Sequence, residues 1–295
     1  MSLNNSKLGT SAVQALLQTK PGLWFIGIGG IHMGALAQYL HARGYRVGGS
    51  DTVAGAQVQR LRDAGIPVFV GHNPARVADY DAAVYTLAIE ERDPEYIAAQ
   101  QLGLPLISRA ELLGALSDEF PVRIGVAGSH GKSTTTAMLA AIFSEAGRKP
   151  TVFCGAPLSP ETGPLQHGEG EACIFEACEY RDSFLCFSPT VAAILGIELD
   201  HVDYFPDTGA IFRAFSRFAA LAQQGGTLIY NAEDALCRAL AESHAGARFG
   251  FGLHVGDCHA RDLQYVQGRG EFSLILQGEE FGKLRLSGLW QFVDS

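Results

Sequence analysis

The chain has 295 residues, and 47% of them are hydrophobic, which suffices for two domains with buried cores. Its formal net charge of −9 at pH 7 argues against binding to nucleic acid, because that function needs a clustered basic surface. No apolar segment reaches the roughly 18 residues of a membrane span, and the N-terminus lacks the order of a signal peptide. We therefore expect a cytoplasmic protein without membrane insertion, whose six cysteines are mostly buried, reduced thiols.

Strands and helices alternate at short spacing through the first part of the chain. The apolar run Leu23–Ile26 predicts a first strand, which leads through a glycine turn into a helix. The elements that follow are helices at residues 35–42, 94–101 and 109–116 and strands at residues 45–51, 67–70, 82–85 and 104–107. This alternation predicts an α/β, Rossmann-like domain over residues 1–118, with a parallel, doubly wound sheet and a linker around residues 117–121.

The turn after the first strand has the glycine spacing of a nucleotide-binding fingerprint. Gly27 and Gly29 match the first two glycines of G-x-G-x-x-G, and His32 stands where the third is expected. Asp51 follows about 20 residues later, and an acidic residue at that spacing commonly bonds a ribose hydroxyl. The pattern favours nucleotide binding and keeps an NAD-linked oxidoreductase in consideration. A purely structural glycine turn is the alternative.

A second glycine turn, from Gly128 to Ser133, separates the apolar run at residues 122–126 from an expected helix. This is the position of a phosphate loop, whose N–H groups and following helix N-terminus would hold polyphosphate oxygens. Lys132 would reach the β- and γ-phosphates, and the Ser133 hydroxyl would bind Mg²⁺. The strict motif G-x-x-x-x-G-K-[ST] is not met, because Val126 stands at its first glycine. An ordinary glycine turn would not require lysine and serine at the first helical positions.

Acidic clusters follow two later apolar runs. Glu176 and Glu179 come after one run, and the Asp-His-Val-Asp segment that contains His201 comes after the other. Because the C-terminal ends of parallel strands share one edge of a sheet, these side chains and the phosphate loop would lie together. Ser133 and Glu176 suit Mg²⁺, and His201 suits a second, softer metal site, so with Lys132 the set could support phosphoryl transfer. A solvated strand end for the glutamates and a structural role for the histidine are the alternatives.

The remaining pattern predicts a P-loop ATPase-like α/β domain with a mainly parallel sheet over residues 119–295. A helix at about residues 211–223 precedes a strand at residues 226–230. From residue 247 to residue 286, the alternating, glycine-punctuated pattern predicts short antiparallel strands at the edge of the sheet. Cys178 lies between two acids and is expected to pack rather than to react, because negative neighbours oppose thiolate formation.

Several of these segments together resemble the Mur ligase family, and the resemblance spans nearly the whole chain. Motifs in the right order are far more specific than any one of them alone. The matching segments are GIGGIHM at 27–33, GSD at 49–51, GHNP at 71–74, RAELL at 109–113, GSHGKSTTT at 128–136, EACEY at 176–180 with SFL at 183–185, and DHVD at 200–203. Within the family, they are most similar to the members that add L-alanine.

The resemblance implies the ligands of both domains. The first would bind UDP-N-acetylmuramate with the uridine near Asp51, and the second would bind ATP with the adenine near Asn231. The diphosphate would lie over Gly29, Gly30, Ile31, His32 and Met33. The ATP phosphates would lie over Gly128, Ser129, His130, Gly131, Lys132, Ser133 and Thr134. Mg²⁺ ions would be held by Ser133, Glu176 and His201.

The resemblance also implies a reaction in peptidoglycan precursor synthesis. In the family's mechanism, the muramyl carboxylate attacks the γ-phosphate of ATP to give an acyl phosphate, and the amine of L-alanine then displaces phosphate to form an amide. The matched residues with catalytic roles would be Lys132, Glu176 and His201.

Three departures from the family pattern bear on this expectation. Cys178 stands where the family usually has Asp, and Gly196 stands where Asn is often seen. Residues 287–291 lie about where a Pro-Gly-x-His-Asn link would lead into a third domain. We therefore expect a fragment without the C-terminal ligase domain, which binds nucleotide weakly and turns over little by itself.

Other functions remain open from the sequence. A muropeptide-recycling ligase of the same family would join a tripeptide, although residues 109–111 and the glycine motif look more like the alanine-adding members. A non-catalytic, ligase-like nucleotide-binding protein is favoured by Gly196 and residues 287–291. The retained Lys132, Ser133, Glu176 and His201 oppose it. An NAD-linked oxidoreductase would leave the phosphate loop unexplained.

Overall fold

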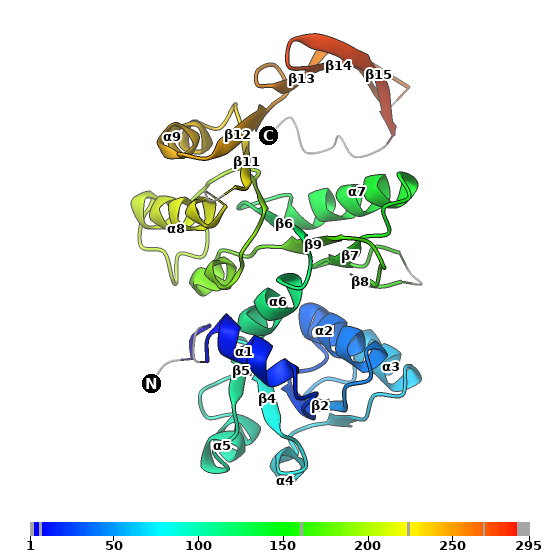
Figure 1. Cartoon of the computed structure of the whole chain (residues 1–295), viewed down its shortest axis with the longest axis vertical. Helices are drawn as coiled ribbons and strands as arrows, with labels where there is room; N and C mark the ends of the chain where they lie inside the picture. The colour runs from blue at the N-terminus through cyan, green and yellow to red at the C-terminus, as the bar shows by residue number, and fades with distance from the viewer. Residues whose placement is uncertain (1–2, 6–7, 160–161, 223–224, 268, 288–295) are drawn as a thin grey trace. The chain divides into compact units, whose positions relative to one another are not determined.

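The computed structural model describes residues 3–5, 8–159, 162–222, 225–267 and 269–287. The chain divides into two compact units, one of residues 1–127 with 131–190 and one of residues 128–130 with 191–295. Both have α/β architecture, which confirms the predicted fold class (Figure 1). The domain boundary predicted after residue 118 stays a prediction. No helix in the described ranges is both long and apolar enough to cross a membrane, and all six cysteines are free thiols.

The first unit opens with a parallel sheet of five strands, in the order β3-β2-β1-β4-β5. The strands are β1 (Leu23–Ile26), β2 (Val47–Asp51), β3 (Val68–Val70), β4 (Ala82–Tyr85) and β5 (Leu106–Ser108). β1 is central, because Leu23 pairs with Val47 on one side and with Ala82 on the other. β2 begins two residues later than predicted, since the Tyr45 N–H donates to the Leu40 carbonyl at 3.1 Å instead of joining the sheet.

The helices around this sheet are α1 (Thr10–Leu17), α2 (Ile31–Ala42), α3 (Ala56–Asp63), α4 (Pro74–Val77), α5 (Pro94–Gln101) and α6 (Arg109–Ser117). α1 lies against α6 (Figure 1). α6 begins with a capping box, in which Ser108 Oγ accepts the Glu111 N–H and the Glu111 carboxylate accepts the Ser108 N–H. α2 begins four residues earlier than predicted, because the Gly30 carbonyl accepts the Gly34 N–H at 2.8 Å. His32 therefore lies in the first turn of α2.

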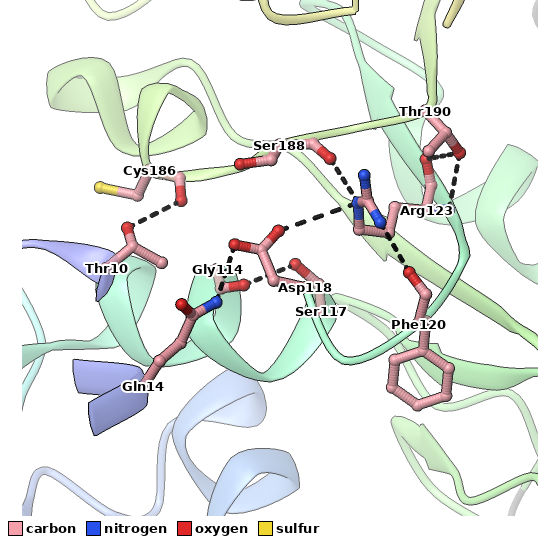
Figure 2. Close-up of polar contacts among 10 residues, drawn as sticks. All are labelled: Thr10, Gln14, Gly114, Ser117, Asp118, Phe120, Arg123, Cys186, Ser188 and Thr190. Atoms are coloured by element: carbon pink, nitrogen blue, oxygen red, sulfur yellow. Dashed lines mark hydrogen bonds and ion pairs between the residues drawn. The ribbon is translucent and has the colours of Figure 1, made fainter. Parts of the chain in front are cut away.

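Side-chain hydrogen bonds hold the predicted linker at residues 117–121 in place (Figure 2). Gln14 on α1 donates from Nε2 to Asp118 Oδ2 at 3.0 Å. Arg123 donates from Nε to the Ser188 carbonyl at 2.5 Å. The first sheet thus passes into the next strand through a short, bonded connection.

Beyond the linker, the first unit contains a second group of strands and helices. These are β6 (Val122–Ala127), β7 (Thr151–Phe153), β8 (Leu165–Gln166), β9 (Ala172–Glu176), α7 (Lys132–Glu145) and the 3-10 segment η1 (Tyr180–Cys186). β9 lies between β6 and β7 and is parallel to both, with Glu176 opposite Val126. The ends of β6 and β9 therefore meet at one edge, as predicted. The segment between β7 and β9 contains β8, which pairs antiparallel with β7 and was not predicted.

The second unit combines parallel and antiparallel strands. Its elements are β10 (Val191–Ile194), α8 (Thr208–Leu221), β11 (Thr227–Asn231), α9 (Ala235–Ser243), β12 (Ala247–Phe251), β13 (Cys258–Val266), β14 (Arg269–Leu276) and β15 (Glu279–Ser287). The strands β10, β11 and β12 are parallel, and β13, β14 and β15 pair antiparallel. The prediction of antiparallel strands from residue 247 is therefore wrong for β12. The cause is the unpredicted helix α9, which Asp234 caps at its Cys237 N–H (2.7 Å) and which returns the chain for parallel pairing.

Candidate nucleotide-binding sites

The first glycine turn connects β1 to α2 and is held by the end of β2. The N–H groups of Gly27 and Ile28 both donate to the Ser50 carbonyl, at 2.9 Å each. The Gly29 N–H donates to Asp51 Oδ2 at 2.8 Å, and a Cβ on Gly29 would lie 2.8 Å from that oxygen. Asp51, predicted to bond a ribose, therefore also fixes the turn, and only glycine fits at position 29 without displacing it.

A cavity of about 390 Å³ opens beside this turn. Its lining includes Gly27, Gly30, Ile31, His32, Met33, Asp51, Arg109 and Cys178. Four predicted substrate-binding residues, from Gly30 to Met33, thus face one cavity together with Asp51, while Gly29 lies behind them, bonded to Asp51. Their role in binding stays a prediction.

Arg109 is the cation of this cavity, and sequence reasoning missed it. It is the first residue of α6, and no carboxylate forms an ion pair with it in the described parts of the chain. Burial lowers the pKa of its guanidinium, which nevertheless stays charged at neutral pH. A buried charge without a partner is costly, so the cavity favours an anionic occupant.

His32 presents a second unsatisfied group to the same cavity. Its Nε2 is buried and has no hydrogen-bond partner among the described residues. Burial, with a smaller contribution from the Arg109 charge, lowers the pKa of His32 to about 3. The imidazole is therefore neutral at pH 7, and its free nitrogen can donate or accept a hydrogen bond to a ligand.

His72, Asp93 and Glu95 also line this cavity and form an acidic group whose atoms are close enough to hold a cation. However, Asp93 Oδ1 caps α5 by accepting the N–H groups of Glu95 and Tyr96, at 2.9 and 3.1 Å. Glu95 is fully buried and accepts from the Asn73 N–H at 2.6 Å and from the Ser50 hydroxyl. These carboxylates therefore hold strand ends and a helix start together.

The phosphate loop ends at Gly131, whose φ of 80° only glycine adopts readily, and Lys132 begins α7. Lys132 Nζ lies 3.2 Å from each carboxylate oxygen of Glu179. The Glu179 side chain is fully buried, and that of Lys132 is 17% exposed. The alternative of a solvated strand end is therefore wrong for Glu179, and the predicted phosphate-binding lysine starts out paired with a carboxylate.

Glu176 ends β9 and is also buried, at 5% exposure. Its Oε1 accepts from the Gly155 N–H and from Cys154 Sγ, while Oε2 makes no hydrogen bond among the described residues. Cys154 Sγ also lies 3.6 Å from the Ser133 carbonyl. Glu176 thus sits beside the start of α7 with one free carboxylate oxygen. A carboxylate oxygen and the Ser133 hydroxyl are hard donors that fit Mg²⁺, and their use as its ligands stays a prediction.

The first half of the loop belongs to the second unit and is held there by the segment after β10. Ser129 Oγ accepts the Glu198 N–H at 2.9 Å, and the Ser129 N–H donates to the Gly196 carbonyl at 3.1 Å. His130 Nε2 lies 3.6 Å from Glu198 Oε2, with both side chains largely exposed. A Cβ on Gly128 would lie 3.0 Å from Leu195 Cβ. These bonds give the loop its turn, and its contact with phosphate stays a prediction.

The other predicted ATP-site residues also lie in the second unit. His201 has a left-handed φ of 52°, and its N–H donates to Asp200 Oδ1 at 2.6 Å. Asn231 is the last residue of β11, where its amide donates to the Leu195 carbonyl at 3.1 Å and its oxygen accepts the Glu233 N–H at 2.9 Å. Whether His201 and Asn231 join Lys132 around one nucleotide stays a prediction.

Two glycine turns, each at the C-terminal end of a parallel strand, are typical of nucleotide-binding α/β proteins, and the second has the position of a phosphate loop. The family description "Mur ligase family, catalytic domain" matches residues 23–121, and "Mur ligase middle domain" matches residues 126–289. The chain belongs to the Mur ligase family, which confirms the resemblance.

Particular relatives narrow the comparison. The chain is 37% identical to the UDP-N-acetylmuramate–L-alanine ligase of Clostridium novyi over 263 residues, which are 89% of this chain and 57% of that ligase. The crystal structure of UDP-N-acetylmuramate-alanine ligase MurC from Thermotoga maritima matches with a TM-score of 0.80 and 26% identity, over 91% of this chain and 61% of that one. The UDP-N-acetylmuramate:L-alanyl-gamma-D-glutamyl-meso-diaminopimelate ligase from Neisseria meningitides matches with a TM-score of 0.82 and 26% identity, over 92% and 89%. The chain thus spans little more than half the length of the Clostridium ligase.

Proposed function

We propose that the chain provides the UDP-sugar-binding and ATP-binding parts of a peptidoglycan precursor ligase that acts in the cytoplasm. The reaction joins L-alanine to the carboxylate of UDP-N-acetylmuramate with the use of ATP. The observation that carries the proposal is the cavity beside the first glycine turn, where Arg109 has no ion pair among the described residues and His32 Nε2 has no partner. A diphosphate supplies the negative charge and the acceptor oxygens that these two groups lack.

The phosphate loop supports the ATP half of the proposal. Lys132 would contact the β- and γ-phosphates, and Ser133 and the free Oε2 of Glu176 would hold Mg²⁺. The metal ion, when bound, neutralises charge on the phosphates. The muramyl carboxylate would attack the γ-phosphorus as ADP leaves. The amine of L-alanine would then attack the acyl carbon of the resulting acyl phosphate, which releases phosphate and a proton as the amide forms. His201 would add a ligand for a second metal ion.

A muropeptide-recycling ligase is the second candidate, favoured by the likeness to the Neisseria ligase. It would use the same two sites and differ in the amine, a tripeptide instead of L-alanine. An assay of the whole protein with both amines separates these candidates. Membership of the Mur ligase family leaves the NAD-linked oxidoreductase without support.

A calorimetric titration of the 295-residue chain with UDP-N-acetylmuramate and with Mg-ATP tests the proposal, alongside the variant Lys132→Ala. We expect two independent sites, so that Lys132→Ala loses Mg-ATP and keeps UDP-N-acetylmuramate. NADH in place of the UDP-sugar is the control ligand for the first site. Binding of neither ligand to the unaltered chain would contradict the proposal and favour the non-catalytic alternative.

A further inference from the structure

Asn5 lies where three parts of the first unit meet, and its side chain is buried, with 7% exposed. Its backbone carbonyl accepts the Ser108 hydroxyl at 2.9 Å and Cys186 Sγ at 3.2 Å. Its amide nitrogen donates to the Arg181 carbonyl at 2.9 Å and to Ser183 Oγ at 2.8 Å. One N-terminal residue thus connects the end of β5 to the segment η1.

The segment η1 needs such support because of its backbone. Arg181 and Asp182 are both left-handed, with φ of 49° and 58°, and neither is glycine. Side chains with a Cβ disfavour this conformation, so two in succession persist only where neighbouring groups fix them. The Asn5 amide bonds the carbonyl of the first of the two. Ser183, its other partner, donates in turn to the Tyr180 carbonyl at 2.7 Å.

The same turn carries the partner of the phosphate-loop lysine. The Asp182 N–H donates to the Glu179 carbonyl at 3.0 Å, so the left-handed turn closes directly onto Glu179. The Glu179 carboxylate lies 3.2 Å from Lys132 Nζ. A continuous series of bonds therefore runs from Asn5 through the turn to Lys132.

We propose that Asn5 is a positioning residue for the phosphate loop: by fixing the turn at Arg181 and Asp182, it holds Glu179 against Lys132. The link from Asn5 to Lys132 rests on the bonds described above. The further consequence, that Asn5 tunes the affinity for Mg-ATP, rests on the function proposed above. The N-terminal segment, far from the loop in sequence, thereby becomes part of the ATP site.

Gln14 provides a matched control from the same N-terminal segment. Like Asn5, it donates a side-chain amide hydrogen bond, at 3.0 Å, but its acceptor is Asp118 in the linker (Figure 2). Thr10, by contrast, donates to the Cys186 carbonyl at 3.3 Å and so touches the far end of η1 (Figure 2). Replacing Gln14 therefore removes a comparable bond and leaves the left-handed turn alone.

Hydrogen–deuterium exchange of the 295-residue chain without nucleotide tests the first step. We expect Asn5→Ala to speed the exchange of residues 180–186 about tenfold, and Gln14→Ala to leave it unchanged. Acetylation of Lys132 by an amine-reactive reagent, followed by peptide mass spectrometry, should rise severalfold in Asn5→Ala only. Unchanged exchange and unchanged Lys132 labelling in Asn5→Ala would overturn the proposal.

Ser183→Ala keeps the test decisive if Asn5→Ala lowers the Tm of the whole chain. It removes one acceptor of the Asn5 amide and should raise exchange in the same peptide, and no rise there would again overturn the proposal. With nucleotide, Asn5→Ala should weaken Mg-ATP binding about fivefold and leave UDP-N-acetylmuramate binding unchanged. If the unaltered chain does not bind Mg-ATP, the proposed function fails, while exchange and labelling still decide the role of Asn5.

Discussion

The two glycine turns of the chain look alike in sequence and differ in their charge. Each follows a strand and leads into a helix, α2 in one case and α7 in the other. Beside the first turn, Arg109 lies in a cavity without an ion pair among the described residues. At the second turn, Lys132 is already paired with the buried Glu179 at 3.2 Å. The first site therefore offers a ligand a positive charge that no ion pair occupies, although Asp51, Asp93 and Glu95 also line its cavity, whereas the lysine of the second site is paired before any ligand arrives.

This difference indicates what each site needs from its ligand. A cavity with an unpaired guanidinium suits an anion that binds without a metal ion. At the phosphate loop, Glu176 adds a further carboxylate beside the Lys132–Glu179 pair, so a bare triphosphate meets net negative charge. A divalent cation bound with the triphosphate reverses that balance. On the proposed function, the same local motif would serve two kinds of ligand because of charges placed by distant segments.

The largest expected effect comes from breaking the Lys132–Glu179 pair. Lys132→Ala removes the ammonium group from a fully buried carboxylate, so the free energy of unfolding should fall by about 3 kcal/mol. Urea denaturation measures this. The double variant Lys132→Ala with Glu179→Gln removes both charges and should recover most of the loss. A stability of Lys132→Ala equal to that of the unaltered chain would show that the pair does not hold the loop.

Removal of Mg²⁺ should weaken ligand binding at the phosphate loop and leave ligand binding at the first site unchanged. With EDTA present, ATP binding should weaken about 100-fold, because no cation offsets Glu176 and the phosphates. UDP-N-acetylmuramate binding should be unchanged, since Arg109 already supplies the positive charge. Titrations of both ligands with and without EDTA give the comparison. Equal sensitivity of the two ligands to EDTA would remove the proposed distinction.

Arg109→Met should remove the unpaired positive charge of the first site. UDP-N-acetylmuramate binding should weaken about 30-fold, the value of one hydrogen bond from a charged group of about 2 kcal/mol. Stability without ligand should not fall, because the variant no longer buries a charge that lacks an ion pair. Arg43→Met is the control, since Arg43 is paired with Glu119 at 2.6 Å and lies outside the cavity. Unchanged affinity in Arg109→Met would place the diphosphate elsewhere.

These charges mark the limit of what sequence could predict. The strand-turn-helix pattern around Lys132 is local, so the loop and the position of Glu176 at a neighbouring strand end follow from short segments. The partnership of Glu179 with Lys132 joins residues 47 positions apart and depends on the left-handed turn after Glu179, which no local pattern reveals. Arg109 looked like one more helix residue, because its unpaired charge arises only when α6 packs beside Cys178 and the first glycine turn.

A smaller loss of stability is expected from substitutions in the first glycine turn, and it measures how closely Asp51 packs against that turn. A Cβ on Gly29 would lie 2.8 Å from Asp51 Oδ2, whereas the nearest atom to a Cβ on Gly30 is 3.5 Å away. Gly29→Ala should therefore lower the free energy of unfolding by about 1.5 kcal/mol through overpacking, while Gly30→Ala changes it by less than about 0.5 kcal/mol. Thermal or urea denaturation of the two variants measures the difference. Equal stabilities would mean that Asp51 moves aside freely.

The smallest expected effect is a pH dependence of the free energy of unfolding that arises from His32 in the first turn. The pKa of His32 is about 3 in the folded chain and about 6.5 when unfolded, so below pH 6.5 the unfolded state binds the extra proton. Stability should therefore fall as the pH drops, by about 1 kcal/mol between pH 7 and pH 5.5 from this group.

His32→Asn removes this contribution and leaves those of the carboxylates and of the buried His244 in place, so the difference between the two chains isolates it. Urea denaturation at the two pH values measures the loss. Saturating UDP-N-acetylmuramate should reduce the loss in the unaltered chain, because a diphosphate beside His32 favours the protonated imidazole and raises its pKa. An identical pH response in both chains would show that His32 is solvated. The contrast between the first cavity, with its unsatisfied groups, and the phosphate loop, with its Lys132–Glu179 pair, would then rest on Arg109 alone.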